Sequence, residues 1–159
     1  MPTEDKKTYM LEAIKMAEEN IASGKGGPFG AVVVKHSKIV ARVGNCVTST
    51  NDPTAHAEVV AIREACKTLE TFDLTGCEIY ASCEPCPMCL GAIMWARIDK
   101  LYYAASRRDA SRAGFDDELF YTELELPAEK RLLKPTQMLQ NEANRVFDKW
   151  IEESDKIPY

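Results

Sequence analysis

The chain has 159 residues, of which 45% are hydrophobic and 28% are charged, and its net charge is −5. This length and composition predict one globular domain that can bury its own core. No apolar run approaches the roughly 20 residues that a membrane-spanning helix needs, which excludes an integral membrane protein. The basic residues are dispersed, apart from Arg107-Arg108 and Lys130-Arg131. A nucleic-acid partner is therefore not expected, because such proteins usually carry a basic patch.

The first third of the chain predicts a helix followed by a hairpin. Apolar residues recur at helical spacing over residues 4–23, and Gly24 ends the pattern. A glycine-rich loop then leads into an apolar, β-branched run at 31–35, which is typical of a buried strand. His36-Ser37 is expected to turn the chain into a second strand at 38–43. These two strands are expected to pair.

The rest of the chain predicts helices that alternate with strands. Residues 51–54 form a turn before a helix over about 55–69, with His56 and Glu58 in its first turn. The further elements expected are a strand at 78–81, a helix from Pro87 to about 97, a strand at 101–105, an acidic irregular stretch at 116–129 and a last helix at about 136–150. Alternation of this kind predicts an α/β fold with a mixed sheet.

Four residues form a pattern suited to metal-dependent hydrolysis. His56, Cys86 and Cys89 offer one imidazole and two thiolates, which are three ligands for a tetrahedral zinc ion. A catalytic zinc site keeps its fourth position open for water, and zinc lowers the pKa of that water to about 7. Glu58 lies two residues from His56 and can move protons for the water. The two cysteines are expected at the start of a helix, where thiolate charge is favoured.

The other cysteines and the N-terminus bear on location and on an alternative site. Residues 1–7 lack the apolar core of a signal peptide, which predicts a cytoplasmic protein with reduced thiols. Cys83 precedes the two ligands by three and six residues, and is expected to lie beside the site or in the core. The alternative to an enzyme is an interaction module with a structural zinc, closed by Cys83 or His36 as a fourth ligand.

The order H-x-E…P-C-x-x-C is similar to the signature of the zinc-dependent nucleobase deaminases. That resemblance implies one zinc per chain, with Glu58 as the catalytic proton carrier outside the coordination sphere. It also implies a cytidine-deaminase-like three-layer α/β/α sandwich around a mixed sheet of about five strands. The resemblance covers residues 8–115 strongly and the tail less so.

Segments around the motif resemble bacterial guanine deaminases more specifically. They are residues 26–32, 51–58, 82–93 and 113–117. The resemblance implies hydrolysis of guanine to xanthine and ammonia in purine metabolism. The tRNA adenosine deaminases share the zinc motif, but they carry a valine-rich loop where this chain has residues 27–30, and Lys-Thr-Gly-Ala where it has 112–115. The alternatives are guanosine as substrate, then cytosine, then adenosine in tRNA.

The same resemblance suggests how a purine would be bound. Asn45 is the candidate amide for the base, and Phe29 and Trp95 are candidate stacking or gating surfaces. The backbone N–H of Ala57 is a candidate donor to the base or the reacting carbon. Asp117, or its neighbour Asp116, is the candidate acceptor for the amine edge. The alternatives are a turn asparagine, core aromatics and a solvated acidic pair.

The C-terminus is the remaining candidate. An apolar and aromatic ending, Ile157-Pro158-Tyr159, follows a polar spacer after the last helix. By resemblance we expect a homodimer in which residues 136–159 close an active site, in the same subunit or in the neighbour. The alternative is a tail that packs on its own domain, because terminal residues are often poorly ordered.

Overall fold

The computed structural model describes residues 4–159, and the chain forms two compact units, Met1–Asp117 and Glu118–Tyr159. Residues 1–3, which belong to the segment where no signal peptide is expected, lie outside the described residues. Every helix within residues 4–159 is too short or too polar to cross a membrane. The elements are α1 (Glu4–Ser23), β1 (Gly30–Lys35), β2 (Lys38–Gly44), α2 (Val47–Thr50), α3 (Ala57–Leu69), β3 (Cys77–Cys83), α4 (Pro87–Trp95), β4 (Lys100–Ala105), α5 (Arg107–Arg112), α6 (Glu118–Glu125), η1 (Ala128–Lys130) and α7 (Gln140–Glu152).

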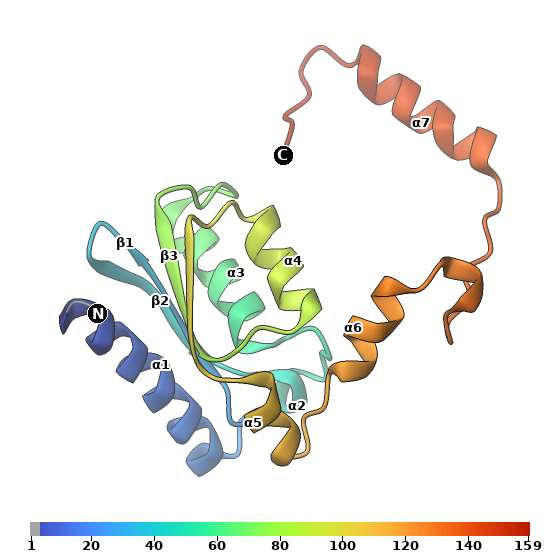
Figure 1. The fold of residues 1–159 in the computed structure, drawn as a ribbon. Helices are drawn as coiled ribbons and strands as arrows, with labels where there is room; N and C mark the ends of the chain where they lie inside the picture. The colour runs from blue at the N-terminus through green and yellow to red at the C-terminus, as the bar shows by residue number, and fades with distance from the viewer. Residues whose placement is uncertain (1–3) are drawn as a thin grey trace. The chain divides into compact units, whose positions relative to one another are not determined.

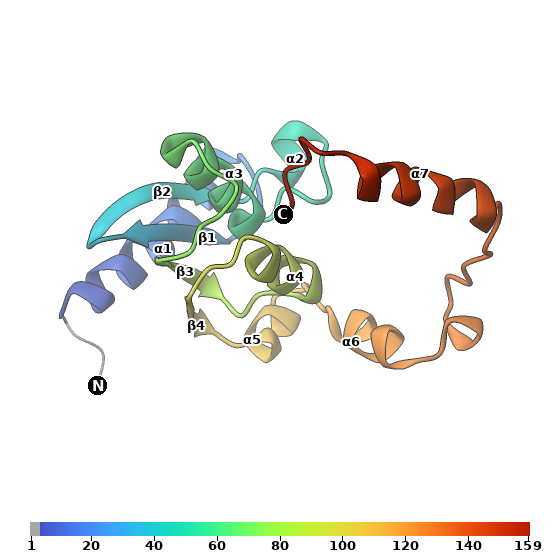
Figure 2. The same cartoon turned by 90° about the horizontal axis from the view of Figure 1, so that it is seen from above.

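The first unit is built on a mixed sheet with the strand order β2-β1-β3-β4. Strand β1 pairs antiparallel with β2 and with β3, whereas β3 and β4 are parallel. The β1–β2 connection is the predicted turn, and His36 and Ser37 both have positive φ, 48° and 60°. Two such residues form the tight turn that matches the twist of paired strands. Figure 2 shows the resulting hairpin, and the predicted hairpin is confirmed.

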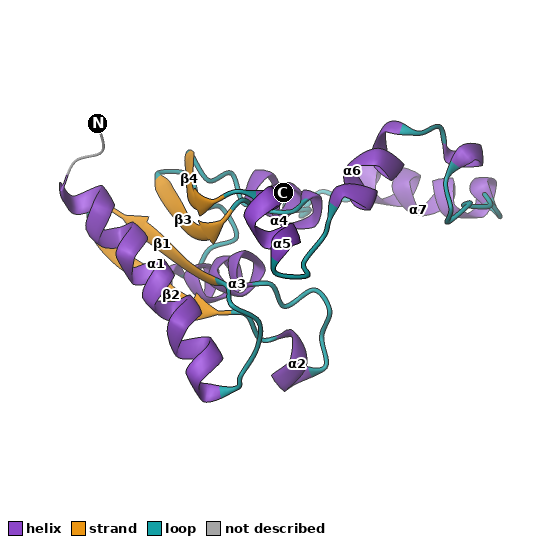
Figure 3. Ribbon diagram, turned by 60° about the horizontal axis from the view of Figure 1, so that its bottom comes forward, coloured by secondary structure: helices purple, strands orange, loops and turns teal. Residues whose placement is uncertain are grey.

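Helices cover both faces of this sheet. Side chains alternate along a strand, so successive residues of β1 face opposite layers. Ala31 and Val33 pack in one cluster with residues of α3 and α4, whereas Val32 and Val34 pack with Ala13 of α1. Helix α1 therefore lies on one face, and α3 and α4 lie on the other (Figures 1 and 3). The predicted three-layer α/β/α sandwich is confirmed.

Several predicted boundaries need correction. The sheet has four strands in the described chain rather than about five. After β4 the chain enters α5, because Ser106 and Asp109 cap each other's backbone N–H groups in a capping box. Helix α7 begins at Gln140, not near residue 136, since the left-handed backbone of Leu139 (φ 52°) cannot continue a right-handed helix. Residues 116–129, expected to be irregular, contain α6 and begin η1.

The second unit, taken by itself, is a chain of three short helical elements. Its longest element, α7, places apolar residues at helical spacing, and these side chains are exposed: Val146, Phe147, Trp150 and Ile151. An amphipathic helix normally buries its apolar stripe against another element. The apolar stripe of α7 is therefore a surface suited to contact with a partner element.

Candidate metal centre

The starts of α3 and α4 bring the three candidate ligands together. Asp52 accepts hydrogen bonds from the N–H and hydroxyl of Thr54 at 2.8 and 2.7 Å, closing the turn that delivers the chain to α3. His56 occupies the N-cap of α3 with an extended backbone, so it lies just before the first turn rather than within it as predicted. Cys86 occupies the N-cap of α4, with Pro87 at the first helical position.

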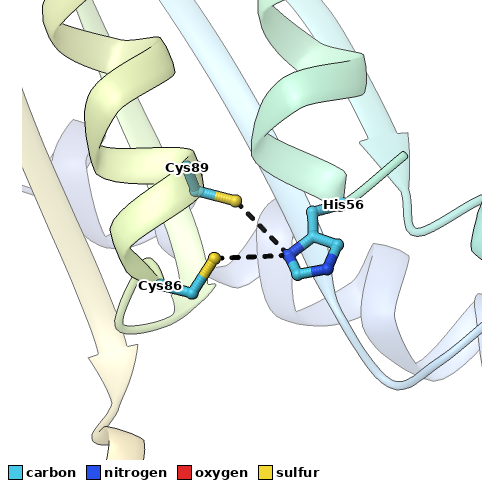
Figure 4. Close-up of side chains that lie close together, drawn as sticks. All are labelled: His56, Cys86 and Cys89. Atoms are coloured by element: carbon cyan, nitrogen blue, oxygen red, sulfur yellow. Dashed lines mark hydrogen bonds between the residues drawn. The ribbon is translucent and has the colours of Figure 1, made fainter. Parts of the chain in front are cut away.

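The ligand atoms of this group, which we call the metal triad (His56, Cys86 and Cys89), converge on one point. His56 Nδ1 lies 3.6 Å from Cys86 Sγ and 3.4 Å from Cys89 Sγ (Figure 4). All three ligand atoms lie within 4.8 Å of one another. A tetrahedral ion with zinc's usual bond lengths to nitrogen and sulfur separates those two atoms by about 3.6 Å. The two nitrogen–sulfur distances of the triad therefore match those of a zinc site.

The pKa values of the two cysteine thiols also suit a bound cation. Hydrogen bonds from the Cys89 thiol and from His56 hold the pKa of Cys86 well below its usual range. The hydrogen bond with Cys86, burial and nearby negative charge raise the pKa of Cys89. Two adjacent thiolates repel each other, so a divalent cation between them would let both ionise. The donor set, one imidazole and two thiols, is one that zinc commonly binds.

Glu58 lies beside the metal triad but outside it. The residue is 8% exposed, and burial raises the pKa of its carboxyl above the ordinary value. Its side chain also interacts with the Cys89 thiol, which places the carboxyl next to the ligand sulfurs. A buried carboxyl with a raised pKa can exchange protons nearer neutral pH, as general acid–base catalysis requires. The position suits the predicted proton carrier.

The structure argues against a fourth protein ligand. The Cys83 thiol donates to the carbonyl of Ser106 at 3.7 Å, and burial raises its pKa to about 11. His36 lies in the β1–β2 turn. Within residues 4–159, the residues that can hold a metal ion together are the three of the triad. An open fourth position is the arrangement of a catalytic zinc, whereas a structural zinc has four protein ligands.

Asn45 lies one residue beyond β2, close to the start of α3. Its Oδ1 accepts from the N–H groups of Val47 at 3.0 Å and Gly27 at 3.4 Å. The next residue, Cys46, donates its backbone N–H to the carbonyl of Ala55, the neighbour of His56. The buried amide is thus tied by backbone hydrogen bonds to the segment that carries a metal ligand, and its role in binding the base stays a prediction.

Phe29 and Asp117 lie in the same unit as the metal triad. Phe29 packs on the core cluster and meets Phe115 edge to face, with ring centroids 4.8 Å apart. Burial raises the pKa of the Asp117 carboxyl, and the negative charge of Cys86 adds to this effect. Asp116 is exposed. Of the acidic pair, Asp117 is therefore the better placed.

Three other candidates remain, of which Ala57 directly follows His56 in the chain. Ala57 is fully buried and opens α3, where backbone N–H groups have no partner within the helix. Trp95 is the last residue of α4 and is 68% exposed, at the opposite end of the helix from Cys86. Tyr159 belongs to the second unit and is 74% exposed.

Sequence reasoning missed the residues that hold the site's loops in place. Glu84 Oε2 accepts from the backbone N–H of Arg107 at 3.0 Å, which ties the segment before Cys86 to the start of α5. Asn20 of α1 donates to the carbonyls of Gly27 and Asn45, both at 2.8 Å. A polar residue on a face that otherwise buries Ala13 and Ala17 was the available signal for Asn20.

Comparison with known proteins agrees with this geometry. The model of the cytidine and deoxycytidylate deaminase zinc-binding region matches residues 3–105. The guanine deaminase of Bacillus subtilis strain 168 is 49% identical over 152 residues, covering 96% of this chain and 97% of that protein. An X-ray structure of guanine deaminase from Bacillus subtilis superposes with a TM-score of 0.94 over 96% of this chain and 98% of that one. A tRNA-specific adenosine deaminase of Aquifex aeolicus is 44% identical over 100 residues, which are 62% of this chain and 66% of that protein.

Proposed function

The chain belongs to the cytidine and deoxycytidylate deaminase zinc-binding family, and on this premise we propose that it hydrolyses guanine to xanthine and ammonia. The observation that carries the proposal is the 49% identity to a guanine deaminase over 96% of the chain. That match includes both the metal triad and the residues after it. The reaction consumes one water per guanine, forms a bond from oxygen to C2 and breaks the bond from C2 to the amino nitrogen. Release of ammonia with formation of xanthine is the direct test.

The residues of this chain fit the proton transfers that the reaction needs. When bound by His56, Cys86 and Cys89, zinc lowers the pKa of a water molecule to about 7. Glu58 takes a proton from the attacking water and delivers it to ring N3 as oxygen adds to C2. The same carboxyl then carries a proton to the departing amine. One buried carboxyl acts as base and then as acid.

Asn45 and Asp117 supply opposite hydrogen-bonding groups for the base. Because Oδ1 of Asn45 accepts two backbone N–H groups, its Nδ2 is left as the donor side of the amide, which suits the purine's O6. The carboxylate of Asp117 accepts hydrogen bonds, which suits the N–H groups at the amine edge. The N–H of Ala57 is a further donor, and Phe29 and Trp95 are proposed as aromatic surfaces against the ring.

Exchanging Asp117 for asparagine is expected to lower kcat/KM for guanine by about tenfold or more, because an acceptor of two hydrogen bonds becomes partly a donor. Asp116→Asn is the matched control, since it makes the same change at the adjacent, exposed carboxyl. Steady-state ammonia release and thermal unfolding are measured for both variants. Equal and small effects on kcat/KM would show that the acidic pair is a solvated surface.

The exposed apolar surfaces support a homodimer. Helix α4 is apolar around its whole circumference, yet Met88, Leu90, Met94 and Trp95 are exposed. A helix that is hydrophobic on all sides is normally buried on all sides. We therefore propose a second copy of the chain as the partner, with residues 136–159 of one subunit closing an active site, that of its own subunit or of its neighbour. Closure would exclude water and position the base.

Deleting residues 157–159 is expected to lower guanine turnover while zinc stays at about one per chain, because Tyr159 lies outside the metal triad. Mixed dimers distinguish the two forms of closure. One subunit carries Glu58→Gln with an intact tail, and the other is truncated but keeps Glu58. Tail exchange predicts activity above the sum of the separate homodimers, whereas closure within each subunit predicts simple additivity. Unchanged kinetics after truncation would leave the tail without a role.

The location and pathway of the reaction follow as part of the same proposal. All six cysteines of the structure are free thiols, which suits a reducing compartment such as the cytoplasm. Guanine and xanthine are both purine bases, so the reaction would belong to purine salvage or breakdown. Guanosine is the alternative substrate, and comparing ammonia release from the base and from the nucleoside decides between them.

A further inference from the structure

Asn20 is the polar member of the buried face of α1, which otherwise buries Ala13 and Ala17. It is 5% exposed, and its Nδ2 donates to the carbonyls of Gly27 and Asn45, both at 2.8 Å. Burying an amide without partners is costly, and these two bonds use both of its donor hydrogens. Asn20 therefore joins two segments that are far apart in sequence, the glycine-rich loop and the end of β2.

The glycine-rich loop and the start of α2 fix the side chain of Asn45. The N–H groups of Gly27 and Val47 both point at one atom of its carboxamide. Two donors facing a single atom identify it as the oxygen, so the NH2 group must lie on the other side of the amide. Asn20 donates to the carbonyl of Gly27, the residue whose N–H is one of the two donors to Asn45 Oδ1, and to the carbonyl of Asn45 itself. The direction in which Asn45 donates thus depends on Asn20.

The packing around this group leaves little room for other arrangements. A Cβ at Gly26 would lie 2.1 Å from the Asn45 carbonyl oxygen, and a Cβ at Gly44 would lie 2.6 Å from Asn20 Oδ1. Both approaches are closer than any real Cβ contact, so these positions need glycine. Gly26 and Gly44 pack directly against the two asparagines. A substitution at Asn20 would therefore shift the backbone of these segments.

The arrangement also lies close to the metal triad. Cys46 follows Asn45 and donates its backbone N–H to the carbonyl of Ala55 at 3.0 Å. Ala55 directly precedes His56. The end of β2 is therefore bonded to the segment that carries a metal ligand, so the orientation of the Asn45 amide is set relative to the place where chemistry occurs.

We propose that Asn20 is a positioning residue that determines specificity for the oxygen at C6 of the purine. It does so by fixing the direction in which Nδ2 of Asn45 donates to that oxygen. The inference rests on the proposed guanine deamination and on the proposed role of Asn45. Asn20 itself would touch neither the base nor the metal ligands. Replacing Asn20 is therefore expected to lower kcat/KM in a way that depends on one atom of the substrate, the oxygen at C6.

The test compares guanine with 2-aminopurine, which keeps the 2-amino group but has no oxygen at C6. Asn20→Asp keeps the shape and replaces the double donor with acceptors. We expect kcat/KM for guanine to fall by about tenfold to a hundredfold. The inhibition constant of 2-aminopurine against guanine turnover is expected to change by less than about twofold, because that ligand makes no bond to the misplaced donor. Asn20→Ser, which can donate to one carbonyl only, is the second variant and should show an intermediate loss.

Two further proteins separate positioning from a general loss of structure. Ala17→Gly weakens the same buried face of α1 without touching the hydrogen bonds, and it should leave the ratio of guanine to 2-aminopurine affinity unchanged. Asn45→Ala removes the amide through which Asn20 is proposed to act. Adding Asn20→Asp to Asn45→Ala should then cause little additional loss, because coupled residues are not additive.

Each outcome decides the inference. A parallel loss for guanine and 2-aminopurine, or a loss that adds fully to that of Asn45→Ala, would make Asn20 merely structural and overturn the proposal. An unchanged kcat/KM for guanine in both Asn20 variants would overturn it as well. The proposed function fails separately, if the zinc-loaded wild-type protein releases no ammonia from guanine.

Discussion

Glu58→Gln is expected to lower guanine deamination by at least about 10²- to 10⁴-fold, the usual contribution of a general acid–base residue. The amide keeps the shape of the carboxyl but cannot take a proton from water and pass it on. Glu58 is not one of the three residues grouped around the metal position, so zinc should remain at about one per chain. Turnover by ammonia release and zinc by elemental analysis, measured on the same sample, separate the two effects.

The control for this change lies on the same helix. Glu64 is an exposed residue of α3. Glu64→Gln therefore makes the same carboxyl-to-amide change at a position that is expected to take no part in the reaction. Its turnover should match the wild type. Near-normal turnover in Glu58→Gln would show that another group moves the protons, and loss of zinc from that variant would show that the carboxyl binds the metal.

Replacing a member of the metal triad is expected to remove both zinc and activity. His56→Ala, Cys86→Ser and Cys89→Ser each leave two protein ligands from the three that converge within 4.8 Å. Two ligands do not hold zinc firmly, because structural and catalytic sites use at least three. Zinc content should fall from about one per chain to near zero, and guanine turnover should fall with it.

Cys83→Ser is the matched control for the cysteine variants. Cys83 is buried at the end of β3, three residues before Cys86, and its thiol donates to the carbonyl of Ser106 rather than to the triad. A serine hydroxyl can donate to the same carbonyl. Zinc should therefore stay close to one per chain in this variant. Loss of zinc from Cys83→Ser, or retention of zinc after Cys86→Ser, would reassign the ligand set.

The sequence predicted most helices and strands of the first unit and the metal triad because these depend on local patterns, whereas the three-layer arrangement followed from the family resemblance. Alternation in residues 31–34 separates the two clusters on either face of the sheet. The spacing of His56, Cys86 and Cys89 places each at or near a helix start, and two helix starts meet in the folded chain. Such local patterns predict structure well when the tertiary packing favours the same secondary structure as the local sequence.

The parts that could not be predicted depend on contacts between distant segments. The hydrogen bond from Asn20 to the Asn45 carbonyl joins residues 25 positions apart, and the bond between Glu84 and Arg107 joins residues 23 positions apart. The interaction of Phe29 with Phe115 spans a still longer separation. The local sequence does not indicate which residues form these contacts, because the contacts depend on how whole helices and strands pack.

The end of the chain shows the same limit for secondary structure. The apolar spacing of α7 is visible in the sequence, but it predicts a start near residue 136. The helix begins four residues later because the left-handed backbone of Leu139 sets its first residue. Helix α6 lies in an acidic stretch that has few signals of its own. Helices of this length draw most of their stability from packing rather than from intrinsic propensity.

Guanine deamination is tested by measuring ammonia release by the zinc-loaded protein from a panel of guanine, guanosine, cytosine, adenine and tRNA. We expect guanine to be the preferred substrate by a wide margin, with xanthine formed in equal amount to ammonia. Preferred release of ammonia from guanosine, cytosine, adenine or tRNA, or no release from guanine, would contradict the proposed function.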